Sequence, residues 1–136
     1  MKVALIQQAY HLNKTQTQAV TVSKIREAGK AGALLIILQE LHQHEYFCQS
    51  EDTAFFAYAN SYEEDLLFWS KVAKDAGIVL VTSLFEKRTA GLYQNTSVVF
   101  EKDGTVAGKY RKMHIPDDPG FYEKFYFTPG ISVLSL

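Results

Sequence analysis

Three ionisable residues stand where this sequence could support acid–base chemistry: Glu40, Lys112 and Glu123. Glu40 closes the apolar run "ALLIILQEL". The crevice beyond the carboxyl ends of strands is where α/β proteins build their sites, and partial desolvation there makes a carboxylate a useful base. The alternative is a carboxylate that only caps the following loop or pairs with an arginine.

Lys112 is expected at the end of a strand, close behind Tyr110. Because side chains alternate along a strand, Tyr110 and Lys112 share one face while Lys109 and Arg111 share the other, which we expect to face solvent. A lysine on the tyrosine side needs a partner for its charge. Otherwise it extends along the sheet edge to reach water.

Glu123 lies among aromatic residues in "GFYEKFYF". An ionised carboxylate in such surroundings needs a nearby donor, and Lys112 is the natural one. Two carboxylates and one ammonium in contact would provide a base and a fixed positive charge for a developing oxyanion.

Other reactive side chains have simpler interpretations. Cys48, in "YFCQ", could be a nucleophile, but a lone cysteine is more often a small buried hydrophobe. His42 and His44 with Glu45 resemble metal ligands only superficially, because no further ligands follow at suitable spacing. We expect the two histidines to be solvated loop residues.

The elements that must position these residues begin with a βαβ unit. Residues 3–9 are predicted to form a buried strand, and a helix is expected from its cap at Asn13 to Gly29 or Gly32. Residues 34–38 then form a strand that is apolar on both faces. Strand, helix and strand in this order favour a parallel pair with a right-handed crossover.

The remaining pattern continues an α/β chain. A long loop is predicted over residues 41–60, with a short helix in "TAFFAYAN", followed by a helix over 61–77 and a strand over 78–85. Strands in "GLYQNTSVVF" and "TVAGKYRK" flank a hairpin turn at Asp103-Gly104. Residues 131–136 alternate as a strand does. All three prolines of the chain fall within residues 110–130.

Composition restricts the class of protein. The 136 residues fit one domain, and 47% hydrophobic with 21% charged residues indicates a globular chain. A formal charge of −1 makes nucleic acid and anionic membrane poor partners. One cysteine excludes an internal disulfide and fits a reducing compartment. The apolar run at the N-terminus is too short for a signal peptide or a membrane span, so we expect a cytoplasmic protein.

The long motif "RKMHIPDDPGFYEKFYFTPG", with "LQEL" and "YFCQ" upstream, resembles the nitrilase, or carbon–nitrogen hydrolase, superfamily. The resemblance runs along the whole chain and covers about the N-terminal half of a family subunit. It implies one domain over residues 1–136 with part of an α-β-β-α sandwich: a mixed sheet with two main helices on one face. It also implies that Glu40 is the general base, that Lys112 stabilises the tetrahedral intermediate, and that Glu123 orients the lysine and the substrate.

The family's nucleophile is a cysteine on a turn after a further strand, which would lie beyond Leu136. Cys48 is in the wrong segment to replace it, so the chain is expected to be truncated before the nucleophile. The resemblance implies no metal and no organic cofactor. It implies partnership with a second copy of the chain or with the missing C-terminal half.

The loop is most similar to that of amidases acting on N-carbamoylputrescine, which implies hydrolysis of a small cationic ureido substrate to putrescine, CO2 and ammonia. Expected substrate-binding residues are Tyr46, Asp117, Asp118 and Tyr122. One loop carboxylate could receive the distal ammonium, although solvated carboxylates are an equally good interpretation; the candidates are Glu45, Glu51, Asp52, Asp117 and Asp118.

Two other functions stay open. The first is another nitrilase-type amidase, such as a β-ureidopropionase-like hydrolase of carbamoyl amino acids. Its substrate ends in a carboxylate and would call for an arginine, yet Arg111, the arginine nearest a site residue, is expected to point away. The second is a non-catalytic half-domain that acts only in assembly.

Overall fold

The computed structural model describes residues 1–132 and opens with the predicted βαβ unit. Strand β1 (Lys2–Ile6) and strand β2 (Ala33–Leu38) pair in parallel, with helix α1 (Lys14–Lys30) between them. The side chain of Asn13 caps the helix, since its Oδ1 accepts a hydrogen bond from the Gln16 N–H at 2.9 Å. The predicted parallel pair and helix cap are therefore confirmed.

The remaining elements complete a mixed five-stranded sheet in the order β1-β2-β3-β4-β5. Strands β1, β2 and β3 are parallel, and β4 is antiparallel to both β3 and β5, so β5 runs in the same direction as β2. In chain order these elements are η1 (Phe47–Gln49), η2 (Thr53–Ser61), α2 (Tyr62–Ala76), β3 (Val79–Thr89), β4 (Leu92–Phe100), β5 (Val106–Arg111) and α3 (Glu123–Tyr126).

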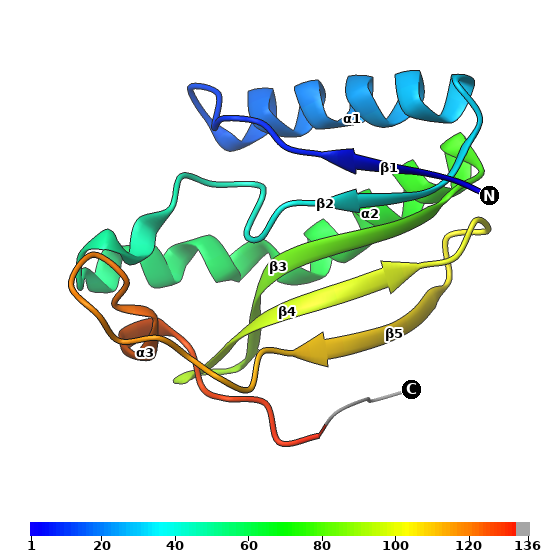
Figure 1. Cartoon of the computed structure of the whole chain (residues 1–136). Coiled ribbons are helices and arrows are strands. Elements are labelled where there is room, and N and C mark those ends of the chain that lie inside the picture. Colours follow the sequence, from blue (N-terminus) through cyan, green and yellow to red (C-terminus); the bar gives the residue numbers. More distant parts are fainter. Residues whose placement is uncertain (133–136) are drawn as a thin grey trace.

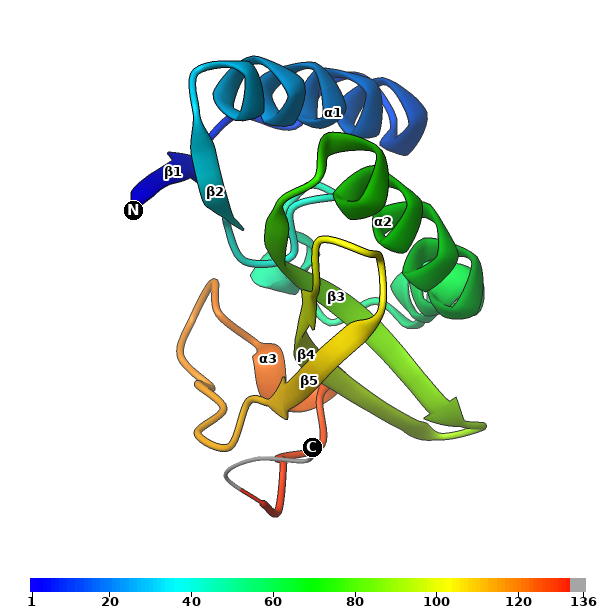
Figure 2. The same ribbon diagram turned by 90° about the vertical axis from the view of Figure 1, so that its right-hand side faces the viewer.

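Both long helices lie on the same face of the sheet (Figures 1 and 2). Ile25 of α1 and Trp69 of α2 are fully buried there against Ile36, Leu80 and Phe100. These are the apolar positions that recur at helical spacing in the sequence and at every second position in the strands. Within residues 1–132, no helix has both the length and the apolar character needed to span a membrane.

The opposite face of the sheet carries apolar side chains that no helix within residues 1–132 covers. Leu5 of β1 is 77% exposed. The neighbouring strands contribute half-buried side chains from Leu35, Ile37, Val81 and Val99. We call these five residues the open face.

Three strand boundaries differ from the predicted ones. Strand β1 ends at Ile6, and β3 continues to Thr89, because the polar residues after Phe85 pair with β4 across the turn at Gly91. Gly91 has φ +79°, a conformation that glycine adopts without strain. Of the strand predicted over 131–136, Ile131 and Ser132 are not in a strand, and the rest lies outside the described residues.

The predicted orientation of Arg111 is wrong in one respect. Its side chain does lie opposite Tyr110 and Lys112, but on the helix-covered face rather than in solvent. There it forms a bidentate ion pair with Glu86, with both nitrogen–oxygen distances at 2.8 Å. Lys109 likewise lies over the Tyr62 ring, 5.3 Å from its centroid. Arg111 lies on the inner face because the buried carboxylate of Glu86 on β3 needs a cationic partner.

Replacing Arg111 with leucine is expected to lower the free energy of unfolding by about 3–5 kcal/mol at pH 7, because Glu86 would stay buried without its partner. Burial raises the pKa of Glu86, but hydrogen bonds from Arg111 and Thr96 outweigh it, so the net pKa is lowered. The ion pair thus stabilises the fold at pH values above the ordinary pKa of a glutamate. Its contribution is lost as the pH falls through the lowered pKa of Glu86.

Urea denaturation at pH 7 and at pH 4 measures this effect. The difference between wild type and Arg111→Leu should shrink at the lower pH. Arg88→Leu changes an exposed arginine of β3 and serves as the matched control. An equal loss of stability in both variants would contradict the assignment.

Candidate active site

Glu40 and Lys112 lie at one edge of the sheet because β2 and β5 run in the same direction. Glu40 follows the end of β2 by two residues, and Lys112 directly follows β5. The chain turns sharply after Glu40, where Leu41 adopts a positive φ of 47°, rare for a leucine. The Leu41 N–H donates to Ser83 Oγ of β3 at 2.9 Å, which fixes this turn.

Lys112 bridges the two glutamates. Its Nζ lies 3.0 Å from Glu40 Oε1 and 3.1 Å from Glu123 Oε2. The predicted convergence of the three residues is therefore confirmed. The side chain of Glu40 is 51% exposed and that of Glu123 only 2%, so Glu123 anchors the lysine from within while Glu40 faces open space.

The three groups together carry a net charge of −1 when all are ionised. Burial raises the pKa of Glu123, and the nearby charge of Glu40 adds to that rise, while Lys112 opposes both. Burial lowers the pKa of Lys112, but its hydrogen bonds to Glu40 and Glu123 outweigh the effect, so the net pKa is raised. The lysine therefore holds a permanent positive charge at neutral pH.

Asn95 and Ser83 support this arrangement, and the sequence did not single them out. Asn95 Nδ2 donates to Glu40 Oε1 at 2.7 Å, Asn95 Oδ1 accepts from Ser83 Oγ at 3.3 Å, and the Asn95 carbonyl accepts from the Lys112 N–H at 2.9 Å. The available signal was weak: on the face that carries Lys112, Ser83 of β3 and Asn95 and Ser97 of β4 are polar residues at alternate positions between apolar or aromatic ones.

The proline-rich loop after β5 holds the backbone of Lys112 in place. Gly130 N–H donates to the Lys112 carbonyl at 2.9 Å, and Tyr122 N–H donates to the Cys48 carbonyl at 2.8 Å. A Cβ at Gly130 would lie 2.2 Å from the Arg111 carbonyl oxygen, so only glycine allows this close approach. Residues 110–130, which contain all the prolines and many aromatic residues, thus lead the chain back to the end of β5. This segment forms one side of the site.

Cys48 is a packing residue, as predicted. It is fully buried in a largely aromatic cluster with Phe47, Phe85 and Tyr126. Burial, followed by the charges of Glu123 and Glu40, raises the pKa of its thiol to about 12, although Lys112 opposes the rise. The thiol is therefore protonated at neutral pH and is a poor nucleophile.

The four expected substrate-binding residues lie in different surroundings. Tyr46 lines a cavity that also contains Glu40, and its ring centroid lies 5.9 Å from that of Phe121. Tyr122 is half-buried next to Glu123. Asp117 and Asp118 are exposed and line neither cavity that contains Glu40. Substrate binding by these four residues stays a prediction.

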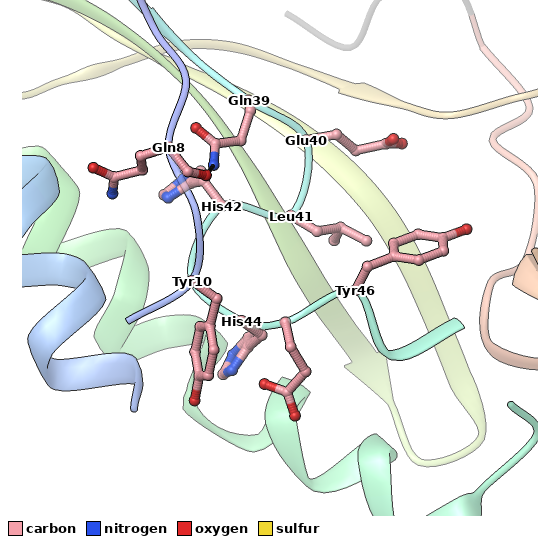
Figure 3. Close-up of a pocket in the computed structure, with 9 residues that line it drawn as sticks. Gln8, Tyr10, Gln39, Glu40, Leu41, His42, His44 and Tyr46 are labelled. Atoms are coloured by element: carbon pink, nitrogen blue, oxygen red, sulfur yellow. Dashed lines mark hydrogen bonds between the residues drawn. The ribbon is translucent and has the colours of Figure 1, made fainter. Parts of the chain in front are cut away.

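Two cavities meet at Glu40. The first, of about 300 Å³, lies over the open face beside Glu40 and Lys112 and is lined by Ser83, Asn95 and Tyr110 among others. The second, of about 200 Å³, lies between the segment that follows β1, which carries Gln8 and Tyr10, and the loop that follows β2 (Figure 3). Because Glu40 and Lys112 both line the first cavity, it is the candidate place for a reacting group.

The expectation that His42 and His44 are solvated is wrong. His42 is only 3% exposed, with its ring edge-on to Trp69 of α2, and His44 is half-buried with its ring stacked on Tyr58 at 4.1 Å. The loop folds inward because Gln43, between them, accepts a hydrogen bond from Trp69 Nε1 at 2.9 Å. Among residues 1–132, no group of three or more potential ligands is arranged to hold a metal ion.

Comparison with known proteins identifies the family of the chain. The carbon–nitrogen hydrolase family model matches residues 2–135. An N-carbamoylputrescine amidase from Oryza sativa is 43% identical over 108 residues, which cover 78% of this chain and 36% of that protein. A citrullinase from Francisella tularensis is 36% identical over 132 residues, which cover 96% of this chain and 46% of the relative.

A solved structure extends the comparison to the fold. The crystal structure of a carbon–nitrogen hydrolase from Helicobacter pylori G27 superposes with a TM-score of 0.92 at 53% identity. The match covers 94% of this chain and 45% of the other. The chain thus spans less than half the length of these relatives.

Proposed function

The chain belongs to the carbon–nitrogen hydrolase family, and from that premise we propose that it supplies the Glu–Lys–Glu part of an active site that hydrolyses a ureido C–N bond. The observation that carries this proposal is the Lys112 ammonium held between Glu40 and Glu123 at 3.0 and 3.1 Å. The nucleophile, a cysteine thiol, would come from polypeptide outside these 136 residues, because Cys48 is buried and protonated.

Glu40 is suited to be the base because it is half-exposed and held by two donors, Asn95 and Lys112. In the proposed first step it takes the thiol proton as sulfur attacks the ureido carbon. The C–N bond to the substrate amine then breaks, and the proton passes to the leaving nitrogen. In the second step Glu40 takes a proton from water, which attacks the carbamoyl thioester. The thiol is released with carbamic acid, which decomposes to CO2 and ammonia.

Lys112 would stabilise the negative oxygen that forms in both tetrahedral intermediates. A ureido carbon is a poor electrophile, so a fixed positive charge beside that oxygen lowers the barrier. Glu123 is too deeply buried to reach substrate freely, and we assign it the role of holding Lys112 in place. Burial of Glu123 keeps its contact with Lys112 away from water, which strengthens that interaction.

N-Carbamoylputrescine is the substrate that we propose, and the Oryza sativa relative of that name supports it. Such hydrolysis would place the protein in putrescine formation. Citrulline is the second candidate, because the citrullinase relative matches 96% of this chain. Citrulline carries the same ureido group and an ammonium, but adds a carboxylate. Arg111 lies on the opposite face of the sheet, engaged by Glu86, which favours the substrate without a carboxylate.

Substrate choice is tested with a polypeptide that joins residues 1–136 to the part that supplies the cysteine. We expect ammonia release from N-carbamoylputrescine with a kcat/KM at least tenfold above that for citrulline. β-Ureidopropionate, which has a carboxylate and no ammonium, should be poorer still. A preference for β-ureidopropionate would contradict the proposal of a cationic substrate. If none of the three compounds were hydrolysed, a role in assembly only would be favoured.

The open face presents exposed and half-buried apolar side chains from neighbouring strands. Contiguous apolar patches of this kind mark sites of association. We propose that further polypeptide, of the kind that makes up the rest of its relatives' length, packs on it; a second copy of the chain is the alternative.

By itself, the 136-residue chain is expected to self-associate and to bind a hydrophobic dye, as seen by light scattering and fluorescence. Leu5→Lys should weaken both signals. Leu12→Lys, at a leucine that is 81% exposed outside the open face, should leave them unchanged. A stable dilute monomer without dye binding would contradict the proposed association.

A further inference from the structure

Residues that line the cavity beside the loop after β2, drawn in Figure 3, carry most of the buried polar side-chain atoms that lack a hydrogen-bond partner in the described part of the chain. Within residues 1–132, seven buried side-chain nitrogen or oxygen atoms have no hydrogen-bond partner, and five of them belong to residues that line this cavity. These are Gln8 Oε1, both ring nitrogens of His42, His44 Nε2 and Glu45 Oε2. Buried polar groups are almost always paired, so such a group of exceptions indicates a missing partner.

Acceptors dominate this set. Glu45 Oε1 accepts from the Tyr58 hydroxyl at 2.6 Å, whereas Oε2 has no partner within hydrogen-bond distance, although the Tyr10 hydroxyl lies near enough for the carboxylate to raise its pKa. Gln8 Nε2 donates to Thr21 Oγ1 at 2.6 Å, and Gln8 Oε1 is a second acceptor that has no donor. Burial lowers the pKa of His42 to about 3, and burial and Lys14 lower that of His44 to about 4. Both rings are therefore neutral. His42, with both nitrogens unpaired, offers one acceptor and one donor, and His44 Nε2 is an acceptor in the tautomer that carries the proton on Nδ1.

The charge of the lining selects a cation. Glu40 and Glu45 line the cavity, and none of the nine lining residues is a lysine or an arginine; because Glu40 is already paired with Lys112 at 3.0 Å, Glu45 is the carboxylate that gives the lining its charge. Tyr10 and Tyr46 add aromatic rings, whose faces attract cations. Tyr10 is 38% exposed and lies at the rim, so the cavity is open to solvent there. The Glu45 carboxylate also adds to the burial effect that raises the pKa of the Tyr10 hydroxyl.

We propose that this cavity, which we call the Glu45 pocket, binds a primary alkylammonium group with Glu45 as its counter-ion. An ammonium supplies three N–H donors to a pocket rich in unpaired acceptors. The volume of about 200 Å³ equals that of about seven water molecules and accommodates a short alkyl chain behind the charged group.

Ligand-observed saturation-transfer NMR tests the site without any need for turnover. The probes are n-butylammonium chloride, tetramethylammonium chloride, which has no N–H donor, and n-butanol, which has no charge. We expect binding of n-butylammonium and at most traces of the other two. Similar signals from all three, or from none, would mean that the pocket holds water only and would overturn the proposal.

Glu45→Gln keeps the shape of the side chain and removes its charge. It should weaken n-butylammonium binding about 10- to 100-fold, the range for a hydrogen bond to a charged group. The matched control is Glu27→Gln, the same change on an exposed glutamate of α1, which should bind as wild type does. Equal affinity in both variants would overturn the assignment. Should Glu45→Gln fail to fold, as judged by circular dichroism, the selectivity of wild type among the three probes still decides.

Competition identifies the source of the ammonium. Putrescine should displace n-butylammonium, and failure to do so would expose the signal as non-specific and overturn the site. If N-carbamoylputrescine also displaces it while neutral N-butylurea does not, the pocket receives the distal end of the substrate. If putrescine alone does so, the pocket receives a free amine. Amine binding is independent of hydrolysis, so failure of the proposed reaction leaves this result standing.

Discussion

Lys112→Met is expected to lower kcat at least 10²- to 10³-fold in a polypeptide that also carries the nucleophile, the cost of removing one oxyanion donor. Methionine nearly matches the length of lysine but carries no charge. Without the ammonium, Glu40 and Glu123 would be left as two facing carboxylates with nothing between them. The loss should therefore fall mainly on kcat, because the positive charge is needed most where the oxyanion develops.

Lys109→Met is the matched control for this prediction. It makes the same change three residues earlier, on the face of β5 that packs against Tyr62 rather than on the site face. We expect its kcat to stay within about threefold of wild type, since substitutions outside a site mostly affect stability. Steady-state kinetics with N-carbamoylputrescine measures both. Comparable losses in the two variants would show that strand β5, and not the Lys112 charge, limits activity.

The edge of the sheet that holds the candidate site could be predicted in part from local patterns, whereas the convergence of Glu40, Lys112 and Glu123 was expected from the family resemblance. The apolar run before Glu40 and the hairpin at Asp103-Gly104 place two strands, and strand alternation puts Lys112 opposite Arg111. Burial of Glu123 among aromatics then requires a cation. These rules need only the chain order and the period of two in a strand.

The supporting contacts could not be predicted because they depend on register between distant segments. Asn95 reaches Glu40 only because β4 pairs with β3 so that Ser83 and Ser97 are opposite each other, which places Asn95 near the end of β2. The inward fold of His42 likewise depends on a hydrogen bond between Gln43 and Trp69, 26 residues apart. Neither contact leaves a periodic signal in the sequence.

The position of Arg111 shows a different limit. Alternation correctly separated its face from that of Lys112, but it could not tell which face the helices cover. The charge of Arg111 suggested that its side chain faces solvent. In the structure Glu86, which Thr96 also contacts, binds the guanidinium in a buried position. The same fact bears on substrate choice, because an arginine engaged on the far face cannot bind a substrate carboxylate beside Lys112.

Glu40→Gln is expected to reduce kcat by 10²- to 10⁴-fold, the usual contribution of a general base. Glutamine keeps an oxygen that can accept from Asn95 and Lys112, so the local geometry should persist while proton transfer is lost. Glu123→Gln makes the same change at the buried partner. Because we assign Glu123 to positioning, we expect about a tenfold loss of kcat and, since a lysine partner is removed, a lower melting temperature.

The order of these two effects separates a base from a positioning residue. Release of putrescine in a single turnover reports the first chemical step, and release of ammonia reports the second. Glu40→Gln should slow both, because the same carboxylate accepts the proton of the thiol and later that of water. Cys48→Ala should slow neither, since its thiol is buried and protonated. If Glu123→Gln proved the more damaging of the two at unchanged stability, the base would be Glu123, and the half-exposed Glu40 would be the residue that holds the lysine.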